Sequence, residues 1–374
     1  MLKHLLIYCQ SVLNSNLNKL LQIKIERSIY HMKIFVTGVN GFIGSHFLEM
    51  ALAQTDWEIQ GFDLADNNIT QFLDNPRFSM KKGDIFKEEA WLNEQIKECD
   101  VLLPLIGIAR PAYYITRPLW TFELDFEQNL KMVRKCAEYG KRVIFPSTSE
   151  VYGMPDPNNK VMDEDNSNLI LGPVSKSRWI YSCSKQMMDR VIFAFGQEMG
   201  LKFTLFRPFN WVGPRLDSFK DASEHKGRSI TQFIYDVLYT GKITLVNGGA
   251  QRRSFTWVGD GVQGLIDIIT NKDDQAEGQI FNIGNPENNY SIKEMAEIVV
   301  DEMKKFPEFK DKADKVEFIV MDSDKYYGKN YDDMQDRLPS VKKMETRLGW
   351  KPKATLREAI HYTLEWYAKN LDKA

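Results

Sequence analysis

Tyr181 and Lys185 are spaced so that they could act together in proton transfer. The stretch from Trp179 to Met199 predicts a helix, and residues four apart on a helix share a face. A lysine ammonium beside a tyrosine favours the phenolate and lowers the pKa of the phenol toward working pH. Such a phenol can take a proton from an alcohol while hydride leaves the same carbon. The spacing alone is a weak signal, because this pair is common by chance.

A polar cluster, Ser147-Thr148-Ser149-Glu150, ends the strand that precedes this helix. Thr148 could supply a hydroxyl that orients both a substrate and Tyr181, which makes the tyrosine–lysine pair a more specific signal. From the residues alone, Glu150 reads as an ion-pair partner at a strand end. Arg337, far along the chain, reads as a solvated surface residue.

A glycine-rich turn, residues 38–44, stands between a predicted strand at 33–37 and a predicted helix at 42–53. Glycines let the backbone approach a pyrophosphate, and the N-terminus of a helix offers free N–H groups. Asp63 closes the second strand, where a carboxylate accepts hydrogen bonds from an adenosine ribose and repels a 2′-phosphate. The alternative for the glycine string is an ordinary tight turn, and the alternative for Asp63 is a helix cap or turn residue. Asp84 could likewise only cap the next helix. The predicted cofactor is NAD, bound by Gly38, Gly41, Phe42, Ile43, Gly44, Asp63, Asp84, Ile85, Tyr181 and Lys185.

Strands and helices alternate from Met32 to Pro208, which predicts right-handed crossovers and a parallel sheet. The expected fold class is α/β, with a Rossmann-type doubly wound parallel sheet and a smaller C-terminal substrate-binding lobe. The predicted cofactor domain spans residues 32–207, and part of residues 255–285 returns to its sheet. The lobe spans 208–374. Residues 1–31 are expected to be a disordered extension, or to come from a start codon upstream of a natural start at Met32.

The composition excludes several classes of protein. Of 374 residues, 43% are apolar and 27% charged, with a net charge of −2, so neither nucleic acid nor an anionic membrane is expected as a partner. No apolar run reaches the roughly 20 residues of a membrane span. Four cysteines without a CxxC pair favour free buried thiols in a reducing, cytoplasmic setting, and no histidine spacing suggests a metal site.

The glycine turn, Asp63, Thr148 and the tyrosine–lysine pair come in an order that resembles the extended short-chain dehydrogenase/reductases, also called NAD-dependent epimerases/dehydratases. The resemblance runs essentially from Met32 to the C-terminus. Within that group, the strings at 145–153, 178–182, 206–211 and 282–287 look like the decarboxylase domain of bifunctional polymyxin-resistance enzymes. Those enzymes convert UDP-glucuronic acid into UDP-4-keto-pentose for the modification of lipid A.

The resemblance implies roles for particular residues. Glu150 would face the sugar and Arg337 would lie near its carboxylate, so the implied catalytic set is Thr148, Ser149, Glu150, Tyr181, Lys185 and Arg337. The implied substrate-binding residues are Ala109, Tyr114, Thr148, Ser149, Arg178, Asn210, Arg228, Thr244, Arg253 and Tyr331. Thr244 departs from the pattern, which has lysine there. No fused formyltransferase domain is expected.

The implied reaction is oxidation of sugar carbon 4 followed by loss of carbon dioxide from the resulting β-keto acid. Release of the ketone is favoured by Ser149, where apiose synthases tend to carry cysteine. The alternatives are a synthase that reduces the ketone to UDP-xylose, a 4-epimerase or dehydratase, and a non-catalytic sugar-nucleotide sensor. A homodimer is expected through the helices at 122–139 and 179–199.

Overall fold

The computed structural model describes residues 31–154, 156, 160–326 and 336–371. Predictions that concern residues 1–30 and Tyr331 lie outside these ranges. No helix in the described part of the chain is both long enough and apolar enough to cross a membrane.

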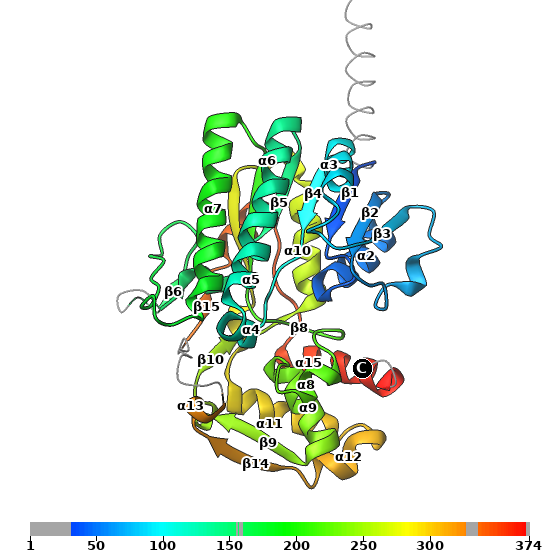
Figure 1. Cartoon of the computed structure of the whole chain (residues 1–374). Coiled ribbons are helices and arrows are strands. Elements are labelled where there is room, and N and C mark those ends of the chain that lie inside the picture. Colours follow the sequence, from blue (N-terminus) through cyan, green and yellow to red (C-terminus); the bar gives the residue numbers. More distant parts are fainter. Residues whose placement is uncertain (1–30, 155, 157–159, 327–335, 372–374) are drawn as a thin grey trace, which may run out of the picture.

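Seven parallel strands form the central sheet (Figure 1), in the order β12-β7-β5-β4-β1-β2-β3. Since the order reverses beside β1, the carboxyl ends of β1 and β4 flank the crevice where such sheets bind ligands. The predicted α/β fold class is confirmed. The strands are β1 (Lys33–Thr37), β2 (Glu58–Asp63), β3 (Phe78–Lys82), β4 (Val101–Pro104), β5 (Arg142–Pro146), β7 (Phe203–Pro208) and β12 (Gln279–Ile283).

Helices cover both faces of this sheet because the strands are apolar on both sides. In β1, Ile34 and Val36 pack into one core while Phe35 packs into the other. The first face carries α2 (Phe42–Gln54), α10 (Val258–Thr270) and α14 (Lys342–Leu348). The second carries α3 (Glu89–Glu98), α6 (Asn129–Tyr139) and α7 (Trp179–Met199), of which α6 and α7 stand side by side in Figure 1.

A separate apolar core holds the part of the chain below the sheet in Figure 1. Its main elements are α9 (Ser229–Tyr235), α11 (Ile292–Met303), α12 (Pro307–Ala313), α15 (Leu356–Lys369) and the parallel pair of β9 (Lys242–Val246) with β14 (Glu317–Met321). Smaller elements complete this region, namely β8 (Trp211–Val212), α8 (Phe219–Ser223), β10 (Arg252–Ser254), β11 (Thr256–Trp257), β13 (Asn289–Ser291) and α13 (Ser323–Tyr326). Two short strands, β6 (Val161–Met162) and β15 (Leu338–Pro339), pair beside the sheet.

The helix expected at 122–139 is interrupted. It consists of α5 (Pro118–Phe122), a π-helical segment η2 (Glu123–Gln128) and α6. A π-helical turn inserts an extra residue and is often found at functional sites. The homodimer expected through this helix and α7 stays a prediction, since the structure is of one chain.

The expectation of buried thiols is wrong for one cysteine. Cys99 and Cys136 are buried and free, but Cys183 is free and exposed. Its neighbours Ser182 and Ser184 are the buried residues of this turn of α7, so Cys183 points outward.

Candidate active site

Most of the residues implied for the substrate line one cavity of about 310 Å³. The cavity lies between the carboxyl ends of the parallel strands and the separate apolar core around α9 and α11. The carboxyl ends of the strands are the expected place for a ligand in this topology. Lys185 and the three glycines Gly38, Gly41 and Gly44 lie outside its lining. The predicted residues in the lining are Phe42, Ile43, Ala109, Tyr114, Thr148, Ser149, Glu150, Arg178, Tyr181, Asn210, Arg228, Thr244, Arg253 and Arg337.

A larger hollow, of about 780 Å³, lies on the other side of α2 between His46 and Trp366. None of the residues singled out in the sequence lines it. The groups with proton-transfer chemistry therefore meet in the smaller cavity.

Tyr181 lies deep in this cavity, with its ring stacked on Tyr114 at 4.6 Å between centroids. Thr148, at the end of β5, hydrogen-bonds to it, as the sequence suggested. The pKa of Tyr181 is nevertheless raised, chiefly by burial and then by the carboxylates of Asp125 and Glu150, which outweigh the help from Thr148. The spacing of Tyr181 and Lys185 predicted a lowered pKa for the phenol, but its net shift is upward.

Asp125 lies beside Lys185 and opposes its effect on the pKa of the tyrosine. The Lys185 Nζ lies 3.3 Å from the Asp125 carboxylate and donates to the Pro146 carbonyl at 3.0 Å. Asp125 is fully buried in the π-helical segment η2, and its other oxygen accepts from the Ile108 N–H at 2.9 Å. The Asp125 carboxylate thus partly balances the positive charge of Lys185 and itself raises the pKa of Tyr181.

Glu150 sits among three arginines. A short turn η3 (Ser149–Tyr152) after β5 presents it, with the Glu150 N–H donating to the Thr148 hydroxyl at 3.2 Å. Its carboxylate accepts from Arg178 at 3.0 Å and from Arg337 at 2.5 Å. Burial would raise the pKa of Glu150, but Arg178, Arg337 and Arg253 together hold it at about 2.

The burial of two arginines in this cluster was not expected from the residues alone. Arg178, implied as a substrate-binding residue, is almost fully buried, lines the cavity and bonds to Glu150. Arg337, taken from the sequence alone as a surface residue, is also buried. The arrangement can offer several guanidinium groups to a carboxylate that enters the cavity.

The glycine turn fits a pyrophosphate. A Cβ on Gly44 would lie 2.2 Å from the Gly38 carbonyl oxygen, and one on Gly38 would lie 2.9 Å from the Ile106 nitrogen, so neither position has room for a side chain. Gly41 caps α2 without a side-chain hydrogen bond, and the first turn holds no acidic residue. The N-terminus of α2 therefore keeps its N–H groups and positive end for a phosphate.

The acidic residues of the predicted cofactor set differ in their surroundings. Asp63 ends β2 and accepts from the N–H groups of Asn40 at 3.0 Å and Leu64 at 2.7 Å, and its burial raises its pKa. Each carboxylate oxygen still has a lone pair for a ribose hydroxyl. Asp84 accepts from the Phe86 N–H at 3.1 Å and pairs with Lys87, as a turn residue would, while Ile85 is buried in the core.

Several lining residues escaped the sequence analysis. His225, Gln232 and Tyr326 line the end of the cavity near the second core. Asp125 was missed as well, because nothing in its local sequence separates it from an ordinary helical residue. The signal that could have indicated it is an acidic side chain on the apolar face of the helix predicted at 122–139.

The sequence matches the model of the NAD dependent epimerase/dehydratase family over residues 34–284. The solved structure of PbgP3 protein from Burkholderia pseudomallei is 43% identical, with a TM-score of 0.82, and the match covers 92% of this chain and 98% of that one.

Two more distant structures share the fold. The dTDP-glucose 4,6-dehydratase of Bacillus anthracis, solved with NAD, is 22% identical with a TM-score of 0.73, covering 91% of this chain and 98% of that one. The UDP-glucuronic acid 4-epimerase of Bacillus cereus, solved with UDP-glucuronic acid and NAD, is 19% identical with a TM-score of 0.75, covering 90% and 99%.

Proposed function

The chain belongs to the NAD-dependent epimerase/dehydratase family and uses NAD, and on that premise we propose that it oxidises and decarboxylates UDP-glucuronic acid, releasing UDP-4-keto-pentose. The cytoplasm is the proposed location, and lipid A modification or nucleotide-sugar metabolism the proposed setting. The finer assignment depends on chemistry inside the cavity, because the fold is shared with epimerases and dehydratases.

The observation that carries the proposal is the cluster of arginines around Glu150, in the same cavity as Tyr181. Arg178 and Arg337 both bond to the Glu150 carboxylate, and Arg253 adds its charge. A neutral sugar ring has no carboxylate for these guanidinium groups to bind. A uronic acid has one, and Arg337 can bind it together with that of Glu150. The related fold of the Bacillus cereus epimerase accommodates UDP-glucuronic acid with NAD, which supports this choice of substrate.

The first chemical step is oxidation of the sugar at carbon 4. When bound, NAD supplies the acceptor for the hydride from that carbon and, in its oxidised form, a positive charge. The Tyr181 phenolate oxygen takes the proton of the carbon 4 hydroxyl and becomes the phenol, with Thr148 hydrogen-bonded beside it to hold the ring in place. The ammonium of Lys185 lies 6.0 Å from the centre of the Tyr181 ring and is paired with Asp125, so the positive charge that it offers to the phenolate is partly balanced.

The second step is loss of carbon dioxide from the β-keto acid. The bond from carbon 5 to the carboxylate breaks, and its electrons pass into the ketone as an enolate. Tyr181 and Thr148 are placed to donate to that oxygen. Arg337, or a water molecule held by Glu150, then protonates carbon 5. The Glu150 carboxylate is ionised at any working pH because its pKa is held at about 2.

A matched pair of substrates tests the proposal. UDP-glucuronic acid and UDP-glucose differ only at carbon 6, where one has a carboxylate and the other a hydroxymethyl group. With NAD present, the kcat/KM for NADH formation should be at least about a hundredfold lower with UDP-glucose, since the arginines would lose their partner. Comparable turnover of the two sugars would contradict the role given to the arginine cluster and favour the epimerase or dehydratase alternatives.

Asp125→Asn is expected to shift the ascending limb of the pH–rate profile to lower pH. The Asp125 carboxylate is second only to burial in raising the pKa of Tyr181, so its removal lowers that pKa and leaves more phenolate at a given pH. Asparagine can still accept from the Ile108 N–H. The measurement is kcat for NADH formation as a function of pH.

Asp267→Asn provides the matched control for this shift. Asp267 is a partly buried carboxylate on α10 that lines the larger hollow and bonds to Gln263. Its replacement should leave the profile in place. If the Asp125 variant has the wild-type profile too, the carboxylate does not control the phenol.

A further inference from the structure

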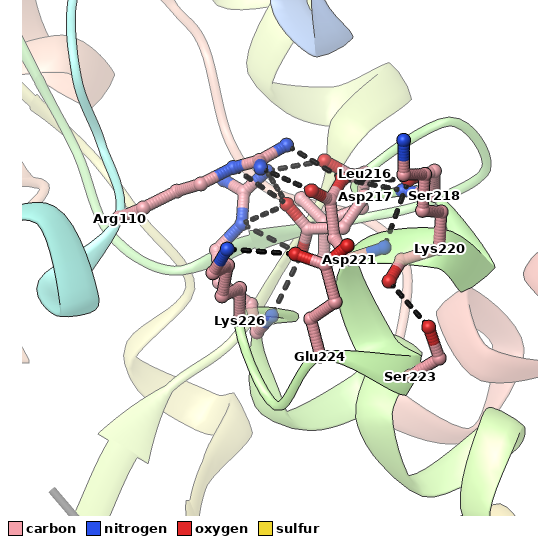
Figure 2. Close-up of polar contacts among 10 residues, drawn as sticks. Arg110, Leu216, Asp217, Ser218, Lys220, Asp221, Ser223, Glu224 and Lys226 are labelled. Atoms are coloured by element: carbon pink, nitrogen blue, oxygen red, sulfur yellow. Dashed lines mark hydrogen bonds and ion pairs between the residues drawn. The ribbon is translucent and has the colours of Figure 1, made fainter.

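An ion-pair network joins two segments of the chain that each contribute residues to the cavity lining. Arg110, which precedes α4 (Pro111–Thr116), donates to both oxygens of Asp221 at 2.6 and 2.9 Å. Its Nε lies 3.7 Å from Asp217. Figure 2 shows the arginine reaching from its own loop to the carboxylates of Asp217, which precedes α8, and Asp221, which lies in α8.

The ends of this network lie on different parts of the fold. Arg110 follows β4 of the sheet, and its neighbours Ala109 and Pro111 line the cavity. Asp217 and Asp221 belong to the segment after β8, whose residues Leu216 and 225–230 line the opposite wall. The ion pairs of Arg110 with Asp221 and Asp217, called the clasp below, therefore join two segments that line the cavity.

The ion-pair network extends from Asp217 to Arg228, which also lines the cavity. Asp217 is fully buried in its side chain and accepts from Arg228 at the backbone N–H, 2.7 Å away, at Nε and at Nη2. The guanidinium of Arg228 lies 5.6 Å from the ring of Phe42, at the start of α2 beside the glycine turn. Asp217 thus fixes the direction of Arg228, and Arg110 contacts the same carboxylate.

The charges in the network balance. Two arginines, Arg110 and Arg228, face two carboxylates, so Arg228 would sit beside an excess of negative charge if Arg110 were lost. Asp221 also accepts from the hydroxyl and N–H of Ser218 in a capping box, which orders the start of α8. The Asp221 carboxylate therefore couples the local structure of the wall to the sheet.

We propose that Arg110 is a positioning residue for nucleotide binding: its clasp with Asp221 and Asp217 holds the wall of residues 216–228 so that Arg228 faces the diphosphate of the nucleotide sugar. This rests on the proposed function for the identity of the ligand. Arg110 itself stays on Asp221 and does not bind the substrate. The clasp could not be predicted from the sequence, because Arg110 and Asp221 are 111 positions apart.

A double-mutant cycle tests the proposal. Arg110→Gln and Asp221→Asn each break the clasp, and asparagine can keep the capping box because it still accepts from Ser218. Each single variant should raise the KM for UDP-glucuronic acid and the Kd for UDP by about fivefold, and the double variant should be no worse than either single one. The kcat for NADH formation should stay within about twofold of wild type, because the reacting groups are untouched.

Glu98→Gln is the matched control, since it breaks a surface pair with Lys33, 2.7 Å long, away from the cavity. It should leave both constants unchanged. If Arg110 bound the diphosphate directly, Asp221→Asn would release it and lower the Kd for UDP; that result, additive effects, or unchanged constants in both single variants would overturn the clasp.

Failure of the proposed function would look different. A wild-type chain that binds UDP but forms no NADH from UDP-glucuronic acid would refute the decarboxylase, while the UDP titrations of the variants would still decide for or against the clasp. A wild-type chain that turns over UDP-glucuronic acid, with both single variants at wild-type KM, would refute only the clasp.

Discussion

Tyr181→Phe is expected to lower the rate of NADH formation from UDP-glucuronic acid by about 10³-fold, within the range seen when a positioned acid–base group is lost. Phenylalanine keeps the ring that stacks on Tyr114 and the buried apolar contacts, so the cavity should retain its shape. What disappears is the phenol oxygen that hydrogen-bonds to Thr148 and, as the phenolate, receives the proton of the carbon 4 hydroxyl. The measurement is the single-turnover appearance of NADH absorbance.

Tyr139→Phe is the control for this variant, because it removes a hydroxyl at the end of α6, away from the cavity lining. It should match wild type. A Tyr181 variant with a rate within about tenfold of wild type would mean that another group accepts the proton. That outcome would also remove the case against a non-catalytic sensor, which rests on this phenol.

Arg337→Met is expected to reduce the release of carbon dioxide by more than about tenfold, a change of ~1.4 kcal/mol in the barrier. Methionine fills part of the same buried space but cannot bind the sugar carboxylate or pass a proton to carbon 5. Oxidation at carbon 4 does not need this arginine, so NADH should still appear in a burst of at most one equivalent per site. Trapped carbon dioxide and NADH absorbance, measured together, separate the two steps.

Arg357→Met offers the comparison for Arg337, since Arg357 is a half-exposed arginine of α15 that pairs with Glu302 at 2.6 Å. It should release carbon dioxide at the wild-type rate. Equal loss of NADH and carbon dioxide in the Arg337 variant would place the arginine in binding rather than in decarboxylation. A loss smaller than tenfold would mean that it is not the group that drives this step.

The sheet and its cofactor turn could be predicted because their signals are local. Apolar, β-branched strands such as 33–37 indicate burial on both faces, and the spacing of Gly38, Gly41 and Gly44 reflects contacts within a single turn. The helix that carries Tyr181 was also predicted with the bounds that the structure gives to α7. Each of these inferences depends on residues within about one element of one another.

The electrostatics of the site could not be predicted in the same way. Spacing places Lys185 one helical turn from Tyr181, but it says nothing of Asp125, which a different helix brings to the lysine. The resemblance placed Glu150 and Arg337 near the sugar, yet their direct contact joins residues 187 positions apart. A pKa depends on every charge that the fold assembles around a group, so a motif fixes the identity of the group and not its acidity.

The balance of carbon dioxide, NADH and sugar product from UDP-glucuronic acid tests the central claim most directly. With NAD in excess, the chain is predicted to form carbon dioxide and NADH in equal amounts, together with a UDP-4-keto-pentose identified by its mass. Carbon dioxide with UDP-xylose and no net NADH would contradict release of the ketone. Conversion of UDP-glucuronic acid to its 4-epimer without carbon dioxide would contradict decarboxylation itself.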